Sequence, residues 1–365
     1  MNNPQQPREY DAVLGGNSPL LEGAAVLGGI EGVKLRLQNP DAKVRTAALE
    51  QALNYGEQGL DLVIEGLKDK SWDVQIAAYL ILISRTEARV KKILLEFKPQ
   101  WLKLKKIHLV IVNKFGNLIQ RQQHIARYFT EDLGNGVTLK MAAIPGGTFM
   151  MGSPENEERR DKFESTPHQV TVPGFFIGKY PVTQAQYQAI TGDNPSRFKF
   201  GSNNRPVEQV SWYDAVAFCE KLSKSTGKNY RLPMEAEWEY ACRAGTTTPF
   251  YFGETITPDL VNYNGFAPYA AAPVGEYRDT TTDVGSFLPN AFGLYDMHGN
   301  VDEWCEDNWD IYVRPPLNGE EDKIVRGGYY HYGANLCRSA ARSYRERDER
   351  TRNCGFRVVL CSENL

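Results

Sequence analysis

The sequence predicts an α+β protein in which an all-α helical module precedes a mixed domain rich in irregular coil. A length of 365 residues suits roughly two domains. Leu, Ala, Val, Glu, Lys and Arg recur at helical spacing over the first of these, whereas Gly, Pro, Trp, Tyr, Thr and Asn with frequent turn signals dominate from residue 134 onward. We therefore expect a flexible N-terminus over 1–18, a helical module over 19–97, a linker over 98–132 and a second domain over 133–365.

Composition excludes several classes of partner. The chain has 42 Lys and Arg against 45 Asp and Glu, so no basic excess favours nucleic acid. Its longest apolar runs fall short of the about 20 residues that cross a bilayer, and its polar N-terminus does not resemble a secretory signal. We expect a cytoplasmic protein with neither a nucleic-acid nor a membrane partner. Its six cysteines form no CxxC pair, which indicates reduced thiols rather than zinc ligands.

The helical module contains a short internal sequence repeat. Val44 and Val74 lie 30 residues apart, and each is followed by paired alanines at the same offset, while Asp41 and Ser71 are good helix caps. This phrase resembles HEAT or armadillo-type repeats, which implies a protein partner at the repeats. A plain helical bundle is the alternative.

The remaining elements follow from local signals. Charges and helix breakers fill residues 98–106, and residues 108–113 have the pattern of a strand. In the second domain we expect helices over 183–191, over 211–225, where Ser211 is the cap, and over 233–244, which opens with proline and glutamates.

Several phrases of the second domain occur in a characteristic order. They are IPGGTFMMGS at 144–153, RLPMEAEWEY at 231–240, NAFGLYDMHGNVDEW at 290–304, RGG at 326–328 and GFRV at 355–358. Their order and spacing resemble the formylglycine-generating-enzyme (sulfatase-modifying factor) family over about 230 residues. The resemblance implies a C-type-lectin-like fold.

The oxidase chemistry of that family needs two cysteines between the Gly-Gly turn and an Ala-Ala-Arg-Ser phrase. The second falls here on Ala334 and the first near Tyr329 or Tyr330, so both thiolates are missing. We therefore assign no catalytic residue and require no cofactor. The alternative is a formylglycine-generating-type oxidase that acts on protein cysteine through a rearranged thiol centre with Cys337.

Residues 329–354 resemble the variable region of diversity-generating-retroelement variable proteins, and the chain looks like a cyanobacterial member of them. Residues 326–360 contain no Lys, Gln, Met or Trp, which codons of the form NNC never encode. The resemblance implies a diversified surface that binds an unknown protein or small-molecule ligand. Its positions are Tyr329, Tyr330, His331, Tyr332, Gly333, Ala334, Asn335, Leu336, Ala341, Ser343, Tyr344, Arg345, Thr351, Arg352 and Asn353.

The chemistry of this segment suits recognition. Tyrosine gives large, stiff contact area, and Ser, Gly and Asn adapt by hydrogen bonding, as in antibody binding loops. We expect the variable side chains to converge mostly on one solvent-facing patch, because exposed positions tolerate change. The framework residues should be buried, and they are Cys337, Arg338, Ser339, Ala340, Phe356 and Val358.

Charge in the segment has two interpretations. Residues 326–360 contain eight arginines and three acidic residues, and this local excess of positive charge favours an acidic ligand. Alternatively, Arg338, Arg342 and Arg357 are internal struts paired with carboxylates such as Asp302, Glu303 or Glu306, and we favour this for those three.

Residues 296–303 match a stretch that holds calcium in family members. Carried over, the resemblance implies oxygen ligands from Asp296, Gly299 and Val301 and a carboxylate from Glu303. A hydrogen-bonded turn without metal is the alternative.

Overall fold

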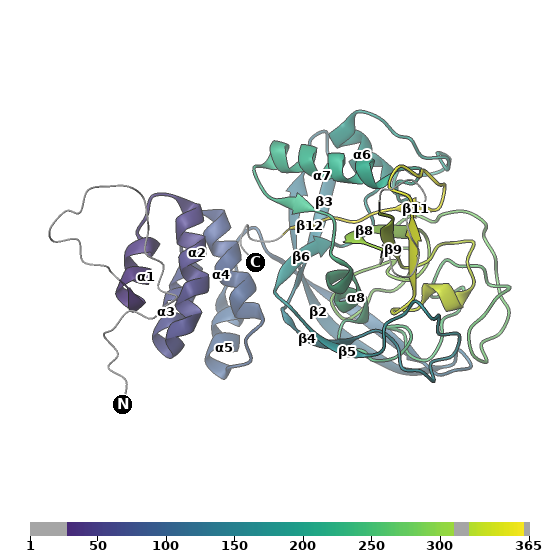
Figure 1. The fold of residues 1–365 in the computed structure, drawn as a ribbon, viewed down its shortest axis with the longest axis horizontal. Coiled ribbons are helices and arrows are strands. Elements are labelled where there is room, and N and C mark those ends of the chain that lie inside the picture. The colour runs from purple at the N-terminus through teal and green to yellow at the C-terminus, as the bar shows by residue number, and fades with distance from the viewer. Residues whose placement is uncertain (1–27, 310–320, 361–365) are drawn as a thin grey trace. The chain divides into compact units, whose positions relative to one another are not determined.

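The computed structural model describes residues 28–309 and 321–360 and divides the chain into two compact units, at Phe97 and Lys98. The first unit is helical and the second is mixed (Figure 1). The flexible N-terminus expected over 1–18 lies outside the described residues. None of the described helices is long and apolar enough to cross a membrane.

Helices alone build the described part of the first unit. They are α1 Gly29–Leu37, α2 Ala42–Ala52, the 3-10 turn η1 Leu53–Tyr55, α3 Gly56–Gly66, α4 Trp72–Ile83 and α5 Ala88–Glu96. Asp41 caps α2 by accepting the Lys43 N–H, as expected, and Val74 and the paired alanines of α4 are buried. Helix α2 packs against both α3 and α4, so each helix covers apolar surface of another.

A buried arginine ties this unit together. Arg45 on α2 is 3% exposed, and its guanidinium donates to both carboxylate oxygens of Asp69, at 2.9 Å each. Asp69 lies between α3 and α4 and also accepts the Ser71 N–H. The pair therefore joins α2 to the α3–α4 turn. The assignment of these helices to HEAT repeats stays a prediction.

The expected linker over 98–132 is wrong. Strands β1 Lys103–Val112 and β2 Leu118–Asp132 pair as an antiparallel hairpin at one border of a six-stranded sheet in the order β1-β2-β3-β6-β12-β7. Ile107 and Leu109 enter the core from β1, whereas its first four residues are exposed and mostly lysine. That charged exposed end explains why the segment resembled a linker.

Short strands, three α-helices and the 3-10 turn η2 Ala334–Cys337 complete the described part of the second unit. The strands are β3 Thr138–Ile144, β4 Gly147–Met151, β5 His168–Val172, β6 Phe175–Gly178, β7 Tyr230–Arg231, β8 Asp302–Asn308, β9 Lys323–Arg326, β10 Arg342–Arg345, β11 Cys354–Gly355 and β12 Val359–Leu360. A second sheet has the order β10-β9-β8-β11, and β4 pairs with β5. Residues 329–354, which we call the variable segment after that resemblance, contribute 342–345 to this sheet through β10 and residue 354 through β11.

The three expected helices are confirmed, with small shifts at their ends. They are α6 Gln184–Thr191, α7 Trp212–Thr226 and α8 Glu235–Arg243. Thr183 and Ser211 form capping boxes, in which each hydroxyl accepts the N–H three residues later. Helices α6 and α7 lie side by side in Figure 1.

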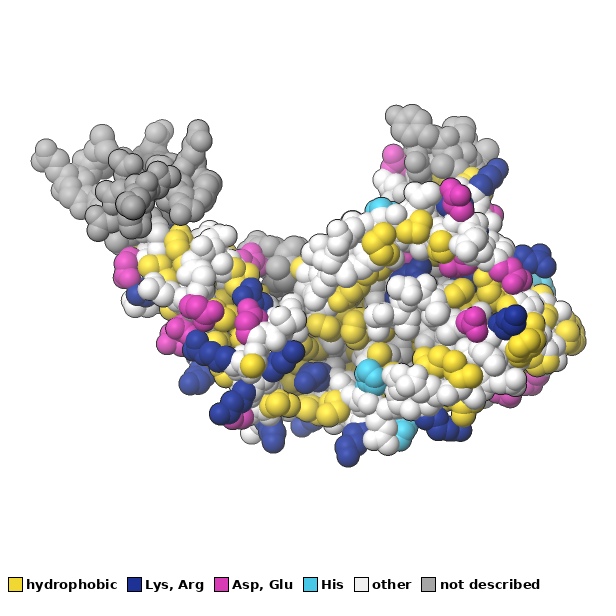
Figure 2. Space-filling view, turned by 90° about the horizontal axis from the view of Figure 1, so that it is seen from below, with side chains coloured by type: hydrophobic (Ala, Val, Ile, Leu, Met, Phe, Trp, Pro, Cys, Tyr) yellow, Lys and Arg dark blue, Asp and Glu magenta, His cyan; other side chains and the backbone are white. Residues whose placement is uncertain are grey.

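The core of the second unit is aromatic. Trp238, Trp304 and Phe356 are fully buried, and the six framework residues expected in the interior are all buried there. Hydrophobic side chains also reach the face drawn in Figure 2, in separate groups among polar atoms.

One buried lysine has three aromatic neighbours. Lys179 is 3% exposed, and its ammonium lies 4.7–4.8 Å from the ring centroids of Tyr128, Tyr180 and Tyr295. Among the described residues no carboxylate lies within 4 Å of it. Burial, with Lys105 and Lys140 nearby, lowers the pKa of Lys179 to about 8.

We expect Lys179→Met to raise the free energy of unfolding at pH 7 by about 2 kcal/mol. The folded protein lowers the pKa of Lys179, so keeping its ammonium charged at pH 7 destabilises the fold, and methionine carries no charge. A lowered lysine pKa makes the unfolded state bind more protons between about pH 8 and 10.5, so the wild-type protein gains stability across that window. The advantage of the variant should therefore shrink above about pH 8 and be lost above about pH 10.5. Urea unfolding across pH measures it, and an advantage that does not change with pH would contradict the assignment.

Candidate functional site: the variable segment

The variable segment lies at the surface only in part. Tyr330, Ala334, Ala341 and Asn353 are buried, at 0–8% exposure, which corrects their assignment to a solvent-facing patch. His331 and Arg352 are exposed, and the other nine positions are half-buried. The segment therefore presents a partly recessed surface anchored by four inward residues.

The buried positions have specific packing. The Tyr330 ring meets the buried Phe198 edge-on at 5.5 Å, and the Ala334 N–H donates to the Ala267 carbonyl oxygen at 3.0 Å. The Asn264 N–H donates to the Tyr332 carbonyl oxygen at 2.9 Å. These main-chain bonds hold the first part of the segment on the loop over 264–267.

Aromatic rings from outside the segment extend its surface. Exposed Phe266 packs on Tyr277 at 5.7 Å, and Tyr277 meets His331 at 5.6 Å. The ring of Tyr329 lies 4.0 Å from that of Tyr332 and 6.4 Å from that of His331. We call these five residues the aromatic surface.

Polar groups mark one end of the aromatic surface. The Tyr277 hydroxyl donates to Asp279 Oδ1 at 2.5 Å and contacts His331 Nδ1, which lies 3.2 Å from the same carboxylate oxygen. These hydrogen bonds lower the pKa of Asp279. Loop residues far from the variable segment in sequence thus contribute both rings and charge to it.

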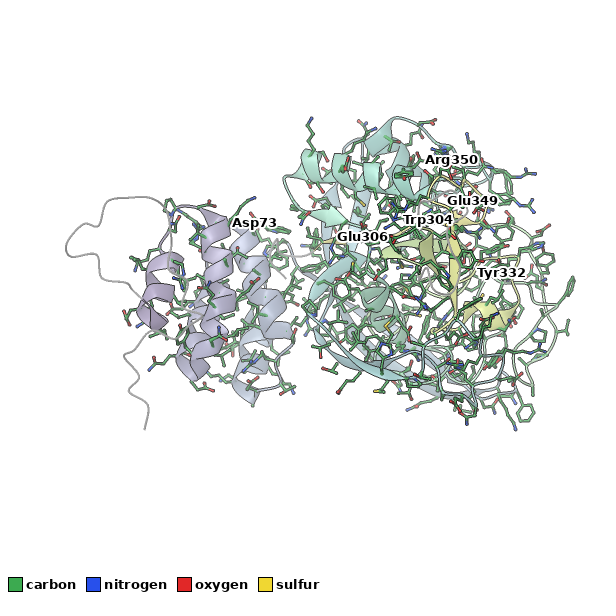
Figure 3. The ribbon with its side chains drawn as sticks, in the orientation of Figure 1. Asp73, Trp304, Glu306, Tyr332, Glu349 and Arg350 are labelled. Carbon is green, nitrogen blue, oxygen red and sulfur yellow. The ribbon has the colours of Figure 1, made fainter. Side chains whose placement is uncertain are left out.

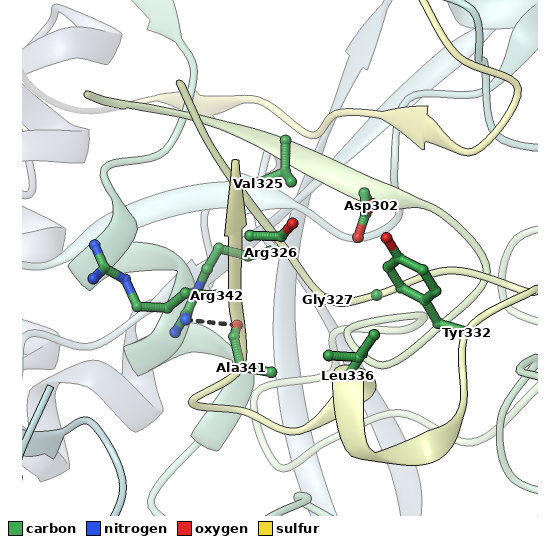
Figure 4. A pocket seen from close by; sticks show the side chains of 10 residues that line it. Asp302, Val325, Arg326, Gly327, Tyr332, Leu336, Ala341 and Arg342 are labelled. Carbon is green, nitrogen blue, oxygen red and sulfur yellow. Dashed lines mark hydrogen bonds between the residues drawn. The ribbon is translucent and has the colours of Figure 1, made fainter. Parts of the chain in front are cut away.

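A pocket of about 50 Å³ opens between the variable segment and the second sheet (Figure 4). Four variable positions line it, namely Tyr332, Leu336, Ala341 and Ser343. Asp302 of β8 lies across from the Tyr332 hydroxyl in Figure 4. The pocket therefore has one variable wall and one framework wall.

Asp302 is the buried carboxylate of this pocket. It is 1% exposed, and its Oδ2 accepts from Arg345 Nη2 at 2.8 Å. Burial raises the pKa of the Asp302 carboxyl, and Arg345 and the Gly328 N–H oppose that rise. Gly328 sits in a tight turn at φ +69°, where a Cβ would lie 2.7 Å from the Leu336 carbonyl oxygen. Arg345, expected as a ligand contact, is thus mostly internal.

The arginines of the segment are largely neutralised. Seven of the eight pair with carboxylates, the exception being Arg352, which has none within 4 Å among the described residues. The three expected struts are confirmed, although only Arg357 pairs with an expected residue, Glu303. Arg338 instead pairs with Glu157 and Glu164, and Arg342 pairs with Glu235. The arginine excess therefore gives no general preference for an acidic ligand.

The four implied calcium ligands do not form a calcium cage. Both oxygens of Glu303 are bonded to Arg357, and one also accepts from Trp238, so a guanidinium occupies the place of a cation. Asp296 Oδ2 accepts the Gly285 N–H, Oδ1 has no partner, and burial raises the pKa of Asp296 to about 6. The Gly299 carbonyl oxygen, one of the implied ligands, already accepts the Val301 N–H at 2.9 Å. Within residues 28–309 and 321–360 no cluster of three acidic, His or Cys side chains suits a metal.

The described cysteines are free and buried. Burial raises the pKa of Cys337, and raises that of Cys242 to about 12. His298 lies 3.9 Å from Cys242, but burial lowers the pKa of its imidazole to about 3, so it supplies no cation that would stabilise a thiolate. Cys361 lies outside the described residues.

Sequence reasoning missed the residues that complete the surface. Phe266, Tyr277 and Asp279 belong to an irregular loop, and Asp302 was considered only as a partner for struts. Exposed aromatics in a coil-rich stretch were the one available signal, but no spacing pattern connects them to residues 329–332.

We expect Tyr330→Ser to lower the free energy of unfolding by about 3 kcal/mol, because it removes a fully buried ring packed on Phe198. His331→Ser is the matched control at the next position, where an exposed side chain should change stability by no more than about 0.5 kcal/mol. Urea unfolding of both variants measures the difference. Equal losses of unfolding free energy in the two variants would show that burial does not distinguish positions that support the fold from positions that are free to vary.

Comparisons with known proteins place the larger unit among related domains. Residues 133–361 match the family described as sulfatase-modifying factor enzyme 1-like domain. The formylglycine-generating enzyme of Mus musculus is 30% identical over 285 residues, covering 60% of this chain and 74% of that protein.

Two solved structures are also similar. Treponema denticola variable protein 1 has a TM-score of 0.53 at 27% identity, covering 64% of this chain and 98% of that one. PvdO from Pseudomonas aeruginosa has a TM-score of 0.53 at 32% identity, covering 63% and 97%.

Proposed function

The chain belongs to the sulfatase-modifying factor enzyme 1-like domain family, and from that premise we propose that it is a binding protein rather than an oxidase. The predicted α+β class with a C-type-lectin-like domain is confirmed. In the proposal the domain displays a diversified recognition surface for a protein or small-molecule ligand. The surface consists of the aromatic surface, the pocket beside Tyr332 and Arg352.

The observation that carries this proposal is the grouping of half-exposed variable rings on a rigid frame. The ring of Tyr329 contacts the rings of His331 and Tyr332, and the Tyr332 carbonyl oxygen accepts the Asn264 N–H, which fixes the backbone at that point. Stiff aromatic side chains held in place lose little entropy on binding and act as anchors. Similarity to a variable protein of Treponema denticola supports the same assignment.

The buried thiols disfavour the oxidase alternative. Both family cysteine positions carry other residues, and Cys337 is fully buried with a raised thiol pKa, so neither its exposure nor its ionisation suits attack on a substrate. Similarity to the mouse formylglycine-generating enzyme is the observation that favours this alternative, and an activity assay tests it. Incubation with copper and a Cys-x-Pro-x-Arg peptide should give no aldehyde product. Aldehyde formation that Cys337→Ser abolishes would overturn the proposal.

A display library tests binding directly. Codons for Tyr329, His331, Tyr332, Ser343 and Arg352 are randomised in the full chain, and selection is run against purified lysozyme and against purified streptavidin. We expect folded variants specific for each target. A second library randomises Glu155, Lys199, Glu220, Lys224 and Asp193, which lie outside the surface, and should give none. Equal yields from both libraries, or none from either, would contradict the proposal.

The surrounding DNA tests the diversification. We expect a near-copy of the codons for residues 329–354 beside a reverse-transcriptase gene, with differences confined to adenines. A genome without such a copy would contradict the retroelement part of the proposal and leave binding to the library experiment.

A further inference from the structure

Asp302 is a framework acid that contacts the variable segment. Its strand, β8, pairs with β9 on one side and with β11 on the other, so the main chain sets its position. Two of the residues beside its carboxylate come from the variable segment, namely Arg345, which donates to it, and Tyr332, which lines the same pocket. Asp302 therefore stays the same in all variants of the chain, while the side chains at 332 and 345 beside it change.

The framework supplies no other cation to this carboxylate. Arg326 and Arg342 also line the pocket, but the first pairs with Glu239 and the second with Glu235. Among the described residues, only the Gly328 N–H and Arg345 donate to the carboxylate of Asp302. Without Arg345 the chain would hold a buried carboxylate with no countercharge, which is unfavourable unless a cation comes from elsewhere.

We propose that Asp302 and the pocket beside Tyr332 form a subsite for a guanidinium group, and that residue 345 decides whether a ligand can enter it. This inference rests on the proposed function, because it names the ligand chemistry of the same surface. In this chain Arg345 fills the subsite from within. A variant with a small residue at 345 leaves it open to an arginine side chain of a protein partner.

Shape and charge fit this ligand. The group that Asp302 receives here is itself a guanidinium, at 2.8 Å, so the local geometry already accommodates one. The adjoining pocket of about 50 Å³ adds room, and the hydroxyl of Tyr332 faces the carboxylate across it (Figure 4). Removing the side chain beyond Cβ at 345 enlarges this space on the side of Asp302.

Chemical rescue tests the subsite in the full chain. We expect Arg345→Ala to lower the melting temperature by roughly 10 °C, because it breaks a buried pair. Millimolar methylguanidinium should restore at least half of that loss, whereas sodium chloride at equal ionic strength should not. The double variant Arg345→Ala/Asp302→Asn should melt higher than the single variant and show no response to methylguanidinium.

Arg350→Ala is the matched control. Arg350 makes a two-point pair with Asp214 that resembles the interior pair in chemistry but is largely exposed, and it lies beside Glu349 in Figure 3. Its loss should change the melting temperature little, with no methylguanidinium response. A response of Arg345→Ala no greater than that of Arg350→Ala, or persistence of the response in the double variant, would overturn the subsite.

Two further arms identify the source of the guanidinium. N-acetyl-arginine amide should stabilise Arg345→Ala at least as well as methylguanidinium, while the lysine analogue should be several-fold weaker, because an ammonium lacks the planar fork. Equal effects of the two amides would overturn the preference for guanidinium. A rescued variant whose displayed library gives no binders would contradict the proposed function alone, so the two failures are distinguishable.

Discussion

Arg338→Met is expected to lower the free energy of unfolding by about 3–5 kcal/mol, because it leaves buried carboxylates without their countercharge. Arg338 is fully buried and donates to Glu157 Oε1 at 2.5 Å, to Glu164 Oε2 at 2.9 Å and to the Asn335 and Arg159 carbonyl oxygens. The loss would therefore act on the loop over 157–164 and on the start of the variable segment together. Urea unfolding measures it.

The pH dependence gives this prediction a second signature. Arg338, with the Ser153 hydroxyl and the Asp161 N–H, holds the pKa of Glu164 below its ordinary value although burial opposes this. A lowered carboxyl pKa contributes stability above about pH 4.5 that is lost as pH falls through the folded value. Burial instead raises the pKa of Glu157, so Glu164 carries this pH-dependent term.

The deficit of Arg338→Met should accordingly shrink in acid. A triple variant with Glu157→Gln and Glu164→Gln should recover part of the stability at pH 7, since neutral amides need no countercharge. A single variant as stable as the wild-type protein at pH 7 would show that the loop does not depend on the pair.

Trp304→Ala is expected to cost about 3–5 kcal/mol, because it removes a large side chain from the core and leaves a cavity. Trp304 on β8 is fully buried, lies opposite Val325 of β9, and donates its indole N–H to the Val210 carbonyl oxygen at 3.0 Å (Figure 3). The side chain thus links the second sheet to the segment that precedes α7.

Phe266→Ala is the control for this prediction. Phe266 is an aromatic residue of the same unit but is 67% exposed, so its removal should change stability by no more than about 0.5 kcal/mol. In binding assays with a selected variant the order of effects should reverse. A melting temperature that falls as far for Phe266→Ala as for Trp304→Ala would place the aromatic surface in the core.

Local signals in the sequence were sufficient for the helices and the framework. Ser211 and Thr183 mark the starts of their helices through hydrogen bonds within four residues. Such local bonds can be predicted from the sequence without knowing the fold. The buried positions of Arg338 and Phe356 followed from motif order. The hairpin over 103–132 was assigned to a linker because the first half of each of its strands is mostly exposed and β1 opens with lysines.

The candidate site depended on contacts between distant residues. Tyr277 meets His331 across 54 residues and Arg342 reaches Glu235 across 107, so no local pattern could assign these partners. Tyr330 and Asn353 were expected at the surface because they fall within the runs that resemble a variable region, but both are buried. Tyr330 instead packs against buried Phe198, and the Asn353 carbonyl oxygen accepts the Asp302 N–H.

The pairing of β9 with β10 bears on how large a repertoire this fold can carry. Ser343 and Tyr344 are held opposite Val325 and Ile324 by main-chain hydrogen bonds, which do not depend on side-chain identity. Most random codons at Ser343 should therefore give folded protein, whereas the ring of Tyr344 also packs against buried Trp309, with 4.7 Å between centroids. Random codons at Tyr330, Ala334, Ala341 and Asn353 instead alter the interior. The fraction of sequence variants that fold should therefore depend mainly on these four positions.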